Sequence, residues 1–212
     1  LEPENARLFY QRGVTLYAIT RYKEALEDIT KAVELEPNNA LYYHVRAVVL
    51  HAMTQYDEAL ANTNRAIELD SGNARYYNGR AKVLQAMKHY NEALGYENKA
   101  IELAPDNAEY YESRGVILHE MKQYAEALED KTKAVELEPN DARYYDSRGV
   151  TLHEMKRYEE ALADKTKTIE LESDNAEYYQ SRGVTLHEMK RYEEALADTT
   201  KAIELAPDNA EY

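Results

Sequence analysis

The stretch Glu109-Tyr110-Tyr111-Glu112-Ser113-Arg114-Gly115-Val116 decides the fold, because closely related octets return at residues 143–150 and 177–184. Each octet lies 34 residues after the one before it, so the chain is read as a tandem repeat. The fifth and sixth repeats are identical at 28 of 34 positions. Extending this register predicts one array over residues 1–212, with partial repeats at 1–5 and 210–212. The six complete repeats cover residues 6–39, 40–73, 74–107, 108–141, 142–175 and 176–209.

The pattern within each repeat predicts two helices and no strand. Counted from the alanine that begins a repeat, bulky apolar residues fall at positions 3, 4, 11 and 14, the spacing of an amphipathic helix of about 14 residues. Asn or Asp just before that alanine is a natural N-cap. A second apolar face follows, and Pro ends the second helix in four repeats. Ser71 and Ser173 replace the proline in the second and fifth repeats, where we expect the helix end to fray.

Small residues recur at positions 8, 20 and 27, as Gly115, Ala127 and Ala134 show in the fourth repeat. We expect the helices to approach closely at these notches. A hairpin of this length cannot enclose a core alone, so neighbouring repeats must stack.

Taken together, these positions resemble the tetratricopeptide repeat (TPR) family over residues 6–209. The matching features are an aromatic residue at position 4, a small residue at 8, Leu at 11, Ala at 20, a small residue at 27 and Pro at 32. The resemblance implies an all-α fold, an α-solenoid in which antiparallel helix hairpins form a right-handed superhelix. It also implies that the first helices line a concave groove that holds partner peptides.

Two departures from the TPR pattern accompany each other. All six repeats carry Arg at position 7, where the family usually has Leu, and position 24 lacks the usual aromatic residue. Four repeats add an Asp at position 23, namely Asp28, Asp130, Asp164 and Asp198. We predict Arg–Asp pairs between the two helices, because a partly buried guanidinium needs a partner. Anion binding by the arginines is the alternative interpretation.

Composition argues against several functions. The formal charge is −14, which disfavours nucleic acids and anionic membranes as partners. The chain has no Cys, which removes disulfides, thiol catalysis and Cys-ligated zinc. No apolar run approaches the ~20 residues of a membrane span, and we expect a cytoplasmic protein.

His-Glu-Met-Lys recurs at His119, His153 and His187, but the second His of a zinc-binding helix is missing. Neighbouring repeats would separate these histidines by roughly 10 Å, too far for a shared metal. No phosphate loop, nucleophile motif or acid–base set is present. We therefore expect no enzymatic activity, catalytic residue, metal or cofactor.

The 20 tyrosines fall mostly at positions 3, 4 and 17, the spacing of a helical core. Stacking on nucleobases is the alternative, which the acidic charge disfavours.

Positions 2, 5, 9, 12 and 13 form a polar stripe on the first helix, and we predict that this stripe is the ligand-binding groove. Its charge is +3 over the first three repeats and −6 over the last three, which favours a basic–hydrophobic protein or peptide segment. Protonation of the histidines below roughly pH 6.5 would weaken such binding. The alternative is that the carboxylates only keep the surface soluble. The candidate residues are Arg7, Tyr10, Val14, Tyr17, His44, Val48, His51, Arg75, Asn78, Lys82, Glu109, Glu112, His119, Glu120, Arg143, Asp146, His153, Glu154, Glu177, Gln180, His187 and Glu188.

Two interpretations of function remain open. The first is a non-enzymatic scaffold that binds a peptide segment of a partner in the groove. The second is a ligand-free structural array, engineered, consensus-like or cut from a longer TPR protein. The chain ends resemble the middle of a repeat array, so we also expect weak head-to-tail stacking between copies through Leu8, Phe9, Ile203 and Leu205.

Overall fold

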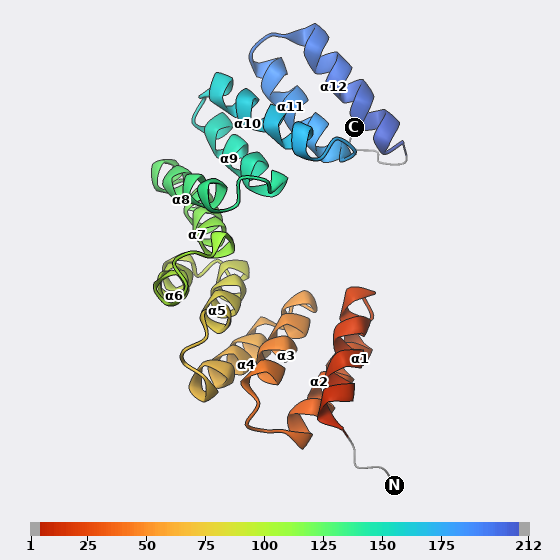
Figure 1. The fold of residues 1–212 in the computed structure, drawn as a ribbon, viewed down its shortest axis with the longest axis vertical. Coiled ribbons are helices and arrows are strands. Elements are labelled where there is room, and N and C mark those ends of the chain that lie inside the picture. The colour runs from red at the N-terminus through yellow and green to blue at the C-terminus, as the bar shows by residue number, and fades with distance from the viewer. Residues whose placement is uncertain (1–4, 208–212) are drawn as a thin grey trace. The chain divides into compact units, whose positions relative to one another are not determined.

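The computed structural model describes residues 5–207, which form twelve α-helices and no strand (Figure 1). The predicted all-α class is confirmed. None of these helices is long and apolar enough to cross a membrane. The helices are α1 (Ala6–Ala18), α2 (Tyr22–Leu35), α3 (Ala40–Ala52), α4 (Tyr56–Leu69), α5 (Ala74–Ala86), α6 (Tyr90–Leu103), α7 (Ala108–Glu120), α8 (Tyr124–Leu137), α9 (Ala142–Glu154), α10 (Tyr158–Leu171), α11 (Ala176–Glu188) and α12 (Tyr192–Leu205).

Consecutive helices pair as antiparallel hairpins, and the hairpins group into two compact units. The unit Leu1–Pro105 contains α1–α6, and the unit Asp106–Tyr212 contains α7–α12. Inside each unit, the second helix of one hairpin packs on the first helix of the next, and successive first helices also touch. This stacking of neighbours is that of a solenoid. The single array over residues 1–212 stays a prediction, and most of its partial repeats, together with residues 208–212, lie outside the described residues.

Capping explains where the first helices begin and end. Each begins after an Asn or Asp whose side chain accepts a hydrogen bond from the backbone N–H two residues later, as Asn107 does from Glu109 at 3.0 Å. Each ends in a left-handed residue without any glycine, such as Lys122 with φ 62°. The N–H of Gln123 then donates to the carbonyl of Leu118, which completes a Schellman motif. The sequence pattern did not reveal these turns, because the usual Gly signal is absent.

The second helices all end at the Leu of position 30, whether Pro or Ser follows two residues later. Leu69 and Leu171 end α4 and α10, the two helices followed by Ser, at the same place as in the other repeats. The helix boundary therefore does not depend on the proline.

The predicted notches are the places where two helices meet. Ala127 and Ala134 are fully buried, and an added Cβ on Gly115 would lie only 2.9 Å from Cγ of Lys131. At Gly13 the corresponding distance to Cδ1 of Ile29 is 2.6 Å. A larger residue at position 8 would push the second helix away.

The Arg–Asp pairs predicted between the helices are present. Arg148 donates from Nε and Nη2 to the two oxygens of Asp164, both at 2.7 Å, and the other three pairs have the same two-bond geometry. In the second repeat Arg46 donates to the neutral amide oxygen of Asn62 at 2.7 Å. Burial lowers the pKa of Arg46, whereas the hydrogen bond with Asp164 raises the pKa of Arg148.

The third repeat replaces the ion pair by an aromatic contact. The guanidinium carbon of Arg80 lies 4.5 Å from the ring centroid of Tyr96, which stands at position 23. In the other five repeats the arginine lies over the aromatic residue at position 4 of its own helix, at 5.3 to 6.0 Å. The arginines of the other five repeats are thus held on two sides by the scaffold, as the structural interpretation expects, whereas Nε and Nη1 of Arg80 are buried without a hydrogen-bond partner.

The tyrosines pack as the core spacing predicts. Those at position 3 are buried in every repeat from the second to the sixth, for example Tyr110. At position 4, the hydroxyls of Tyr43, Tyr77 and Tyr179 donate to the backbone carbonyl six residues earlier, at 3.1 to 3.2 Å. These three hydroxyls therefore tie α3, α5 and α11 to the loops that precede them.

Overpacking a notch should destabilise the chain locally. Ala161 is fully buried beside Gly149, so Ala161→Leu is expected to lower the free energy of unfolding by about 1–3 kcal/mol. Hydrogen exchange should accelerate most in residues 108–209, because repeats couple mainly to their neighbours. Ala163→Leu, on the exposed side of the same helix, is the control and should change stability by less than about 0.5 kcal/mol. Uniform exchange changes along the chain would contradict this local picture.

Candidate functional site

The predicted groove stripe divides by burial into three groups. Exposed residues are Arg7, Val14, Arg75, Lys82, Glu109, Glu120, Arg143, Glu154, Glu177, His187 and Glu188. Partly buried residues are Tyr10, Tyr17, Val48, His51, Glu112, His119, Asp146, His153 and Gln180. His44 and Asn78 are buried. A ligand role for these residues stays a prediction, but the structure shows that positions 2 and 13 are mostly open and position 5 is mostly covered.

Position 5 is covered because it faces the next repeat. In the unit Asp106–Tyr212, the hydroxyl of Ser147 on α9 donates to the carboxylate of Glu112 on α7. Lys131 on α8 is buried and donates from Nζ to the backbone carbonyl of Ser147 at 3.1 Å. Burial raises the pKa of Glu112 and lowers that of Lys131, while each charge partly offsets the shift of the other. Three helices thus meet at one polar network.

The same network repeats one hairpin later. Ser181 on α11 donates its hydroxyl to Asp146 at 3.1 Å, and Lys165 donates to the carbonyl of Ser181 at 2.9 Å. Burial raises the pKa of Asp146 and lowers that of Lys165 to about 8. Glu112 and Asp146 therefore belong to the contacts between repeats. They contribute less to the field over the stripe than a count of −6 assumes.

Two of the three histidines of the repeated motif also serve these contacts. Nδ1 of His119 lies 3.0 Å from Oγ1 of Thr151, and Nδ1 of His153 lies 3.1 Å from Oγ1 of Thr185. Each ring also packs edge-on against a tyrosine at position 17. Burial, followed by the nearby lysines, lowers the pKa of both histidines, so they charge at a more acidic pH than the expected 6.5. Across the described residues, no cluster of three or more His, Asp or Glu side chains is arranged to hold a metal.

In the unit Leu1–Pro105, the equivalent contact between the second and third repeats is hollow. A cavity of about 230 Å³ lies between α3, α4 and α5, with Tyr17 of α1 at one side. Five of its lining residues belong to the predicted stripe, and these are Tyr17, His44, Val48, His51 and Lys82. Sequence reasoning missed the cavity, because its remaining walls come from other helical faces.

His44 is the polar centre of this cavity. Its side chain is 8% exposed, and its Nδ1 is buried without a hydrogen-bond partner among the described residues. The ring lies 5.2 Å from that of Tyr76. Burial, together with Arg75 and Lys82, lowers the pKa of His44 to about 4, so the imidazole is neutral at pH 7.

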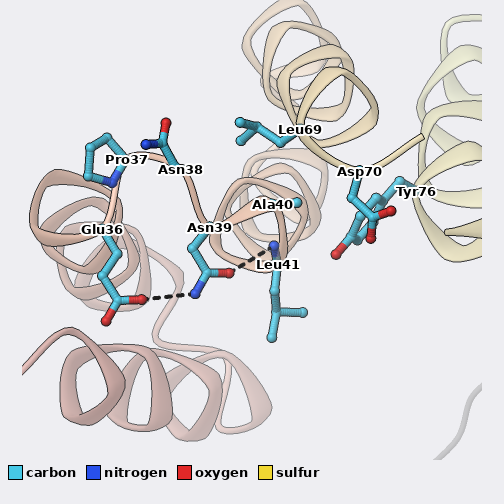
Figure 2. A pocket seen from close by; sticks show the side chains of 9 residues that line it. All are labelled: Glu36, Pro37, Asn38, Asn39, Ala40, Leu41, Leu69, Asp70 and Tyr76. Atoms are coloured by element: carbon cyan, nitrogen blue, oxygen red, sulfur yellow. Dashed lines mark hydrogen bonds between the residues drawn. The ribbon is translucent and has the colours of Figure 1, made fainter. Parts of the chain in front are cut away.

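A larger hollow of about 620 Å³ borders the loop between α2 and α3, and Figure 2 shows its lining. Asn39 accepts from the N–H of Leu41 at 3.2 Å and donates to the Glu36 carboxylate at 2.9 Å. The side-chain amide of Asn39 in this hollow is thus used to cap α3 and to bind Glu36. We therefore assign these polar groups to helix capping rather than to a ligand site.

Ion pairs recur along the second helices. Every second helix carries an ion pair between positions 26 and 29, and three more pairs join positions 16 and 19. On the first helices, Glu154, Glu177 and Glu188 are exposed and form no ion pair within residues 5–207. The charges left without an ion pair therefore include those on the stripe of α9 and α11.

Comparison with protein families finds the repeat in several parts of the chain. Models described as tetratricopeptide repeat match residues 6–39, 29–61, 74–107, 97–129 and 176–209. A comparison with curated protein sequences gave no significant match.

Solved structures include one relative at 30% identity. This is YrrB, described as a TPR protein with an unusual peptide-binding site, with a TM-score of 0.63 over 85% of this chain and 93% of YrrB. The pilF structure of Pseudomonas aeruginosa has 22% identity and a TM-score of 0.80, over 98% of this chain and 94% of that one. A chain of the APC/C hetero-tetramer Cut9–Hcn1 has 15% identity and a TM-score of 0.84, over 99% of this chain and 42% of that one. The last two likenesses show the fold alone.

The depressed pKa of His44 should make stability depend on pH. His44 takes up a proton near pH 6.5 in the unfolded chain but only near pH 4 in the folded chain. The contribution of neutral His44 to the free energy of unfolding is therefore complete above pH 6.5 and is lost as the pH falls toward 4. The loss is on the order of 2–3 kcal/mol relative to His44→Phe, which keeps a ring without the titration. Urea unfolding of both proteins between pH 4 and 7 measures this loss. The acidic groups that both proteins share affect the two equally and cancel in the comparison. Parallel pH profiles would show that His44 is not the cause.

The network around Lys131 should behave as one unit. Lys131→Met is expected to lower the free energy of unfolding by about 1–3 kcal/mol, because the carbonyl of Ser147 loses its donor and the carboxyl group of Glu112 loses a nearby cation. Adding Glu112→Gln should restore part of that loss, since a neutral amide needs no cation. Lys133→Met, in an exposed pair on the same helix, should change stability by less than about 0.5 kcal/mol. Additive effects of Glu112→Gln and Lys131→Met would mean that no such network contributes.

Proposed function

Because the chain belongs to the tetratricopeptide repeat family, whose fold is typical of protein–protein interaction scaffolds, we propose that it binds a peptide segment of a partner protein along its first helices. TPR proteins are generally non-enzymatic scaffolds. YrrB, at 30% identity, is described as having a peptide-binding site, which supports a peptide as the ligand here.

The observation that carries the proposal is that exposed carboxylates without an ion pair lie on the stripe of α9 and α11. On the second helices, the carboxylates at position 29 are each matched by a cation one turn away. On α9 and α11, Glu154, Glu177 and Glu188 project from the stripe without such a match.

We further propose that the preferred segment is basic and hydrophobic. Position 9 supplies the apolar part, since Val150 is 36% exposed and Val184 is 51% exposed next to the carboxylates. Each exposed ion pair contributes only ~0–1 kcal/mol, so several must act together with an apolar anchor to give useful affinity. Such binding weakens as salt screens the charges.

Peptide titration tests this preference. Wild type should bind a Lys- and Leu-containing peptide about tenfold more tightly than a matched Glu-containing peptide, and less tightly at higher salt. The variant Glu120→Lys, Glu154→Lys, Glu188→Lys should lose the preference, because three stripe carboxylates are reversed.

A matched control separates local charge from net charge. Glu129→Lys, Glu159→Lys, Glu193→Lys introduces the same charge change on exposed positions of α8, α10 and α12 and should retain the preference. Equal affinity of wild type for both peptides, or equal losses in the two triple variants, would rule out the stripe as the binding face.

A further inference from the structure

The cavity around His44 has a definite structural origin. In the unit Asp106–Tyr212, the space between position 24 and position 6 of the next repeat is occupied by a lysine, as between Lys131 and Ser147. The equivalent residues in the unit Leu1–Pro105 are Thr63 and Gly79, which are much shorter. Thr63 turns its hydroxyl to the carbonyl of Leu60 at 2.9 Å, so its hydrogen-bonding capacity is used within its own helix. The short residues leave a hollow where the other unit has a side chain.

Gly79 also places the imidazole of His44. An added Cβ on Gly79 would lie 2.9 Å from Cε1 and 3.1 Å from Nδ1 of His44. A serine, as found at position 6 in the last three repeats, would therefore crowd the ring. The glycine leaves room for the imidazole at the cavity wall, where Nδ1 has neither a partner nor accessible surface, so a ligand reaches Nδ1 only when the ring turns. A buried polar atom without a partner costs free energy, so a ligand that supplies the partner gains affinity.

Size and polarity narrow the ligand. An apolar cavity of ~150 Å³ can accept benzene, so a cavity of about 230 Å³ has room for a six-membered ring with a substituent. Ala47, Val48 and Val83 form apolar walls, and Lys82 is the cationic residue of the lining. A neutral imidazole nitrogen either donates or accepts, depending on the tautomer. A phenol hydroxyl can do both, so it satisfies Nδ1 in either tautomer, whereas indole can only donate.

We propose that the cavity formed by His44, Val48, Thr63, Gly79 and Val83 binds a phenol ring whose hydroxyl hydrogen-bonds Nδ1 of His44. The ring is supplied either by a free small phenol or by a tyrosine side chain of a bound peptide. The second source rests on the proposed peptide-binding function, and the first does not.

Two-dimensional NMR of the full chain with p-cresol and toluene tests the site directly. We expect p-cresol to shift amides of α3, α4 and α5, with at least threefold higher affinity than toluene. Thr63→Met, which fills the cavity as Lys131 fills its counterpart, should weaken p-cresol binding at least tenfold. Thr199→Met makes the same change at the exposed position 24 of the last repeat and should leave binding unchanged. Absence of p-cresol binding, or equal binding to wild type and Thr63→Met, would overturn the proposal.

The hydrogen bond is tested separately, so the result does not depend on how well Thr63→Met folds. His44→Phe should bring the affinities for p-cresol and toluene to within about twofold of each other, because the nitrogen is gone. An unchanged preference for p-cresol in this variant would overturn the role of Nδ1.

Paired neutral peptides that differ only in Tyr or Phe distinguish the two sources. A Tyr preference that Thr63→Met removes supports a tyrosine side chain, and p-cresol binding without a Tyr preference supports a free phenol. Failure of the charged peptides to bind the stripe would defeat the proposed scaffold function and leave the p-cresol result standing. Failure of p-cresol would defeat the cavity proposal and leave the stripe result standing.

Discussion

The close approach of the two helices within a repeat is the constraint on which the other features depend. Gly or Ala at position 8 and Ala at position 20 bring the backbones so near that a Cβ on Gly13 would lie 2.6 Å from the Ile29 side chain. Where position 8 is glycine, the first helix offers no side chain at this point, and the residue at position 24 of the second helix packs against it, as Ile29 does at Gly13 and Lys131 at Gly115. The guanidinium at position 7 then bridges the edge of the hairpin to position 23. Position 24 is one of the places where the repeats differ.

Those differences determine the character of the contact between neighbouring repeats. Where position 24 is Lys131 or Lys165, the side chain donates to a serine carbonyl of the next repeat, and the hydroxyl of that serine donates to a carboxylate at position 5. Where position 24 is Thr63, the side chain is too short to contact the next repeat. The residue at position 5 is then the neutral His44, and a cavity remains. The same backbone arrangement therefore supports a filled, charged contact in one unit and a hollow one in the other. The pKa shifts at both sites follow from burial of these groups.

Periodicity predicted the helices, their N-caps, the notches and the Arg–Asp pairs, because all of these depend on residues within one hairpin. Position 5 was assigned to the open stripe because periodicity considers only the residues of one hairpin. A single helix shows which side is polar, but Ser147 covers Glu112 from the next repeat, 35 residues away. The lysines at position 24 were visible in the sequence, yet the partners of Lys131 and Lys165 lie in the following repeat and follow no helical spacing. The Schellman turns at Thr20 and Lys122 were missed because their left-handed residues are not glycine.

Contacts that span two repeats have a consequence for how such a chain diverges after duplication. In a copied repeat, position 24 contacts the repeat that follows and position 6 contacts the repeat that precedes. Immediately after duplication, both contacts are therefore made by residues inherited from the parent repeat. One later substitution at either position changes a single contact and leaves the residues that define the hairpin untouched. The fifth and sixth repeats, identical at 28 of 34 positions, already differ at position 24, where Lys165 corresponds to Thr199. New binding chemistry can therefore accumulate at the joints between repeats while each hairpin keeps its ancestral packing.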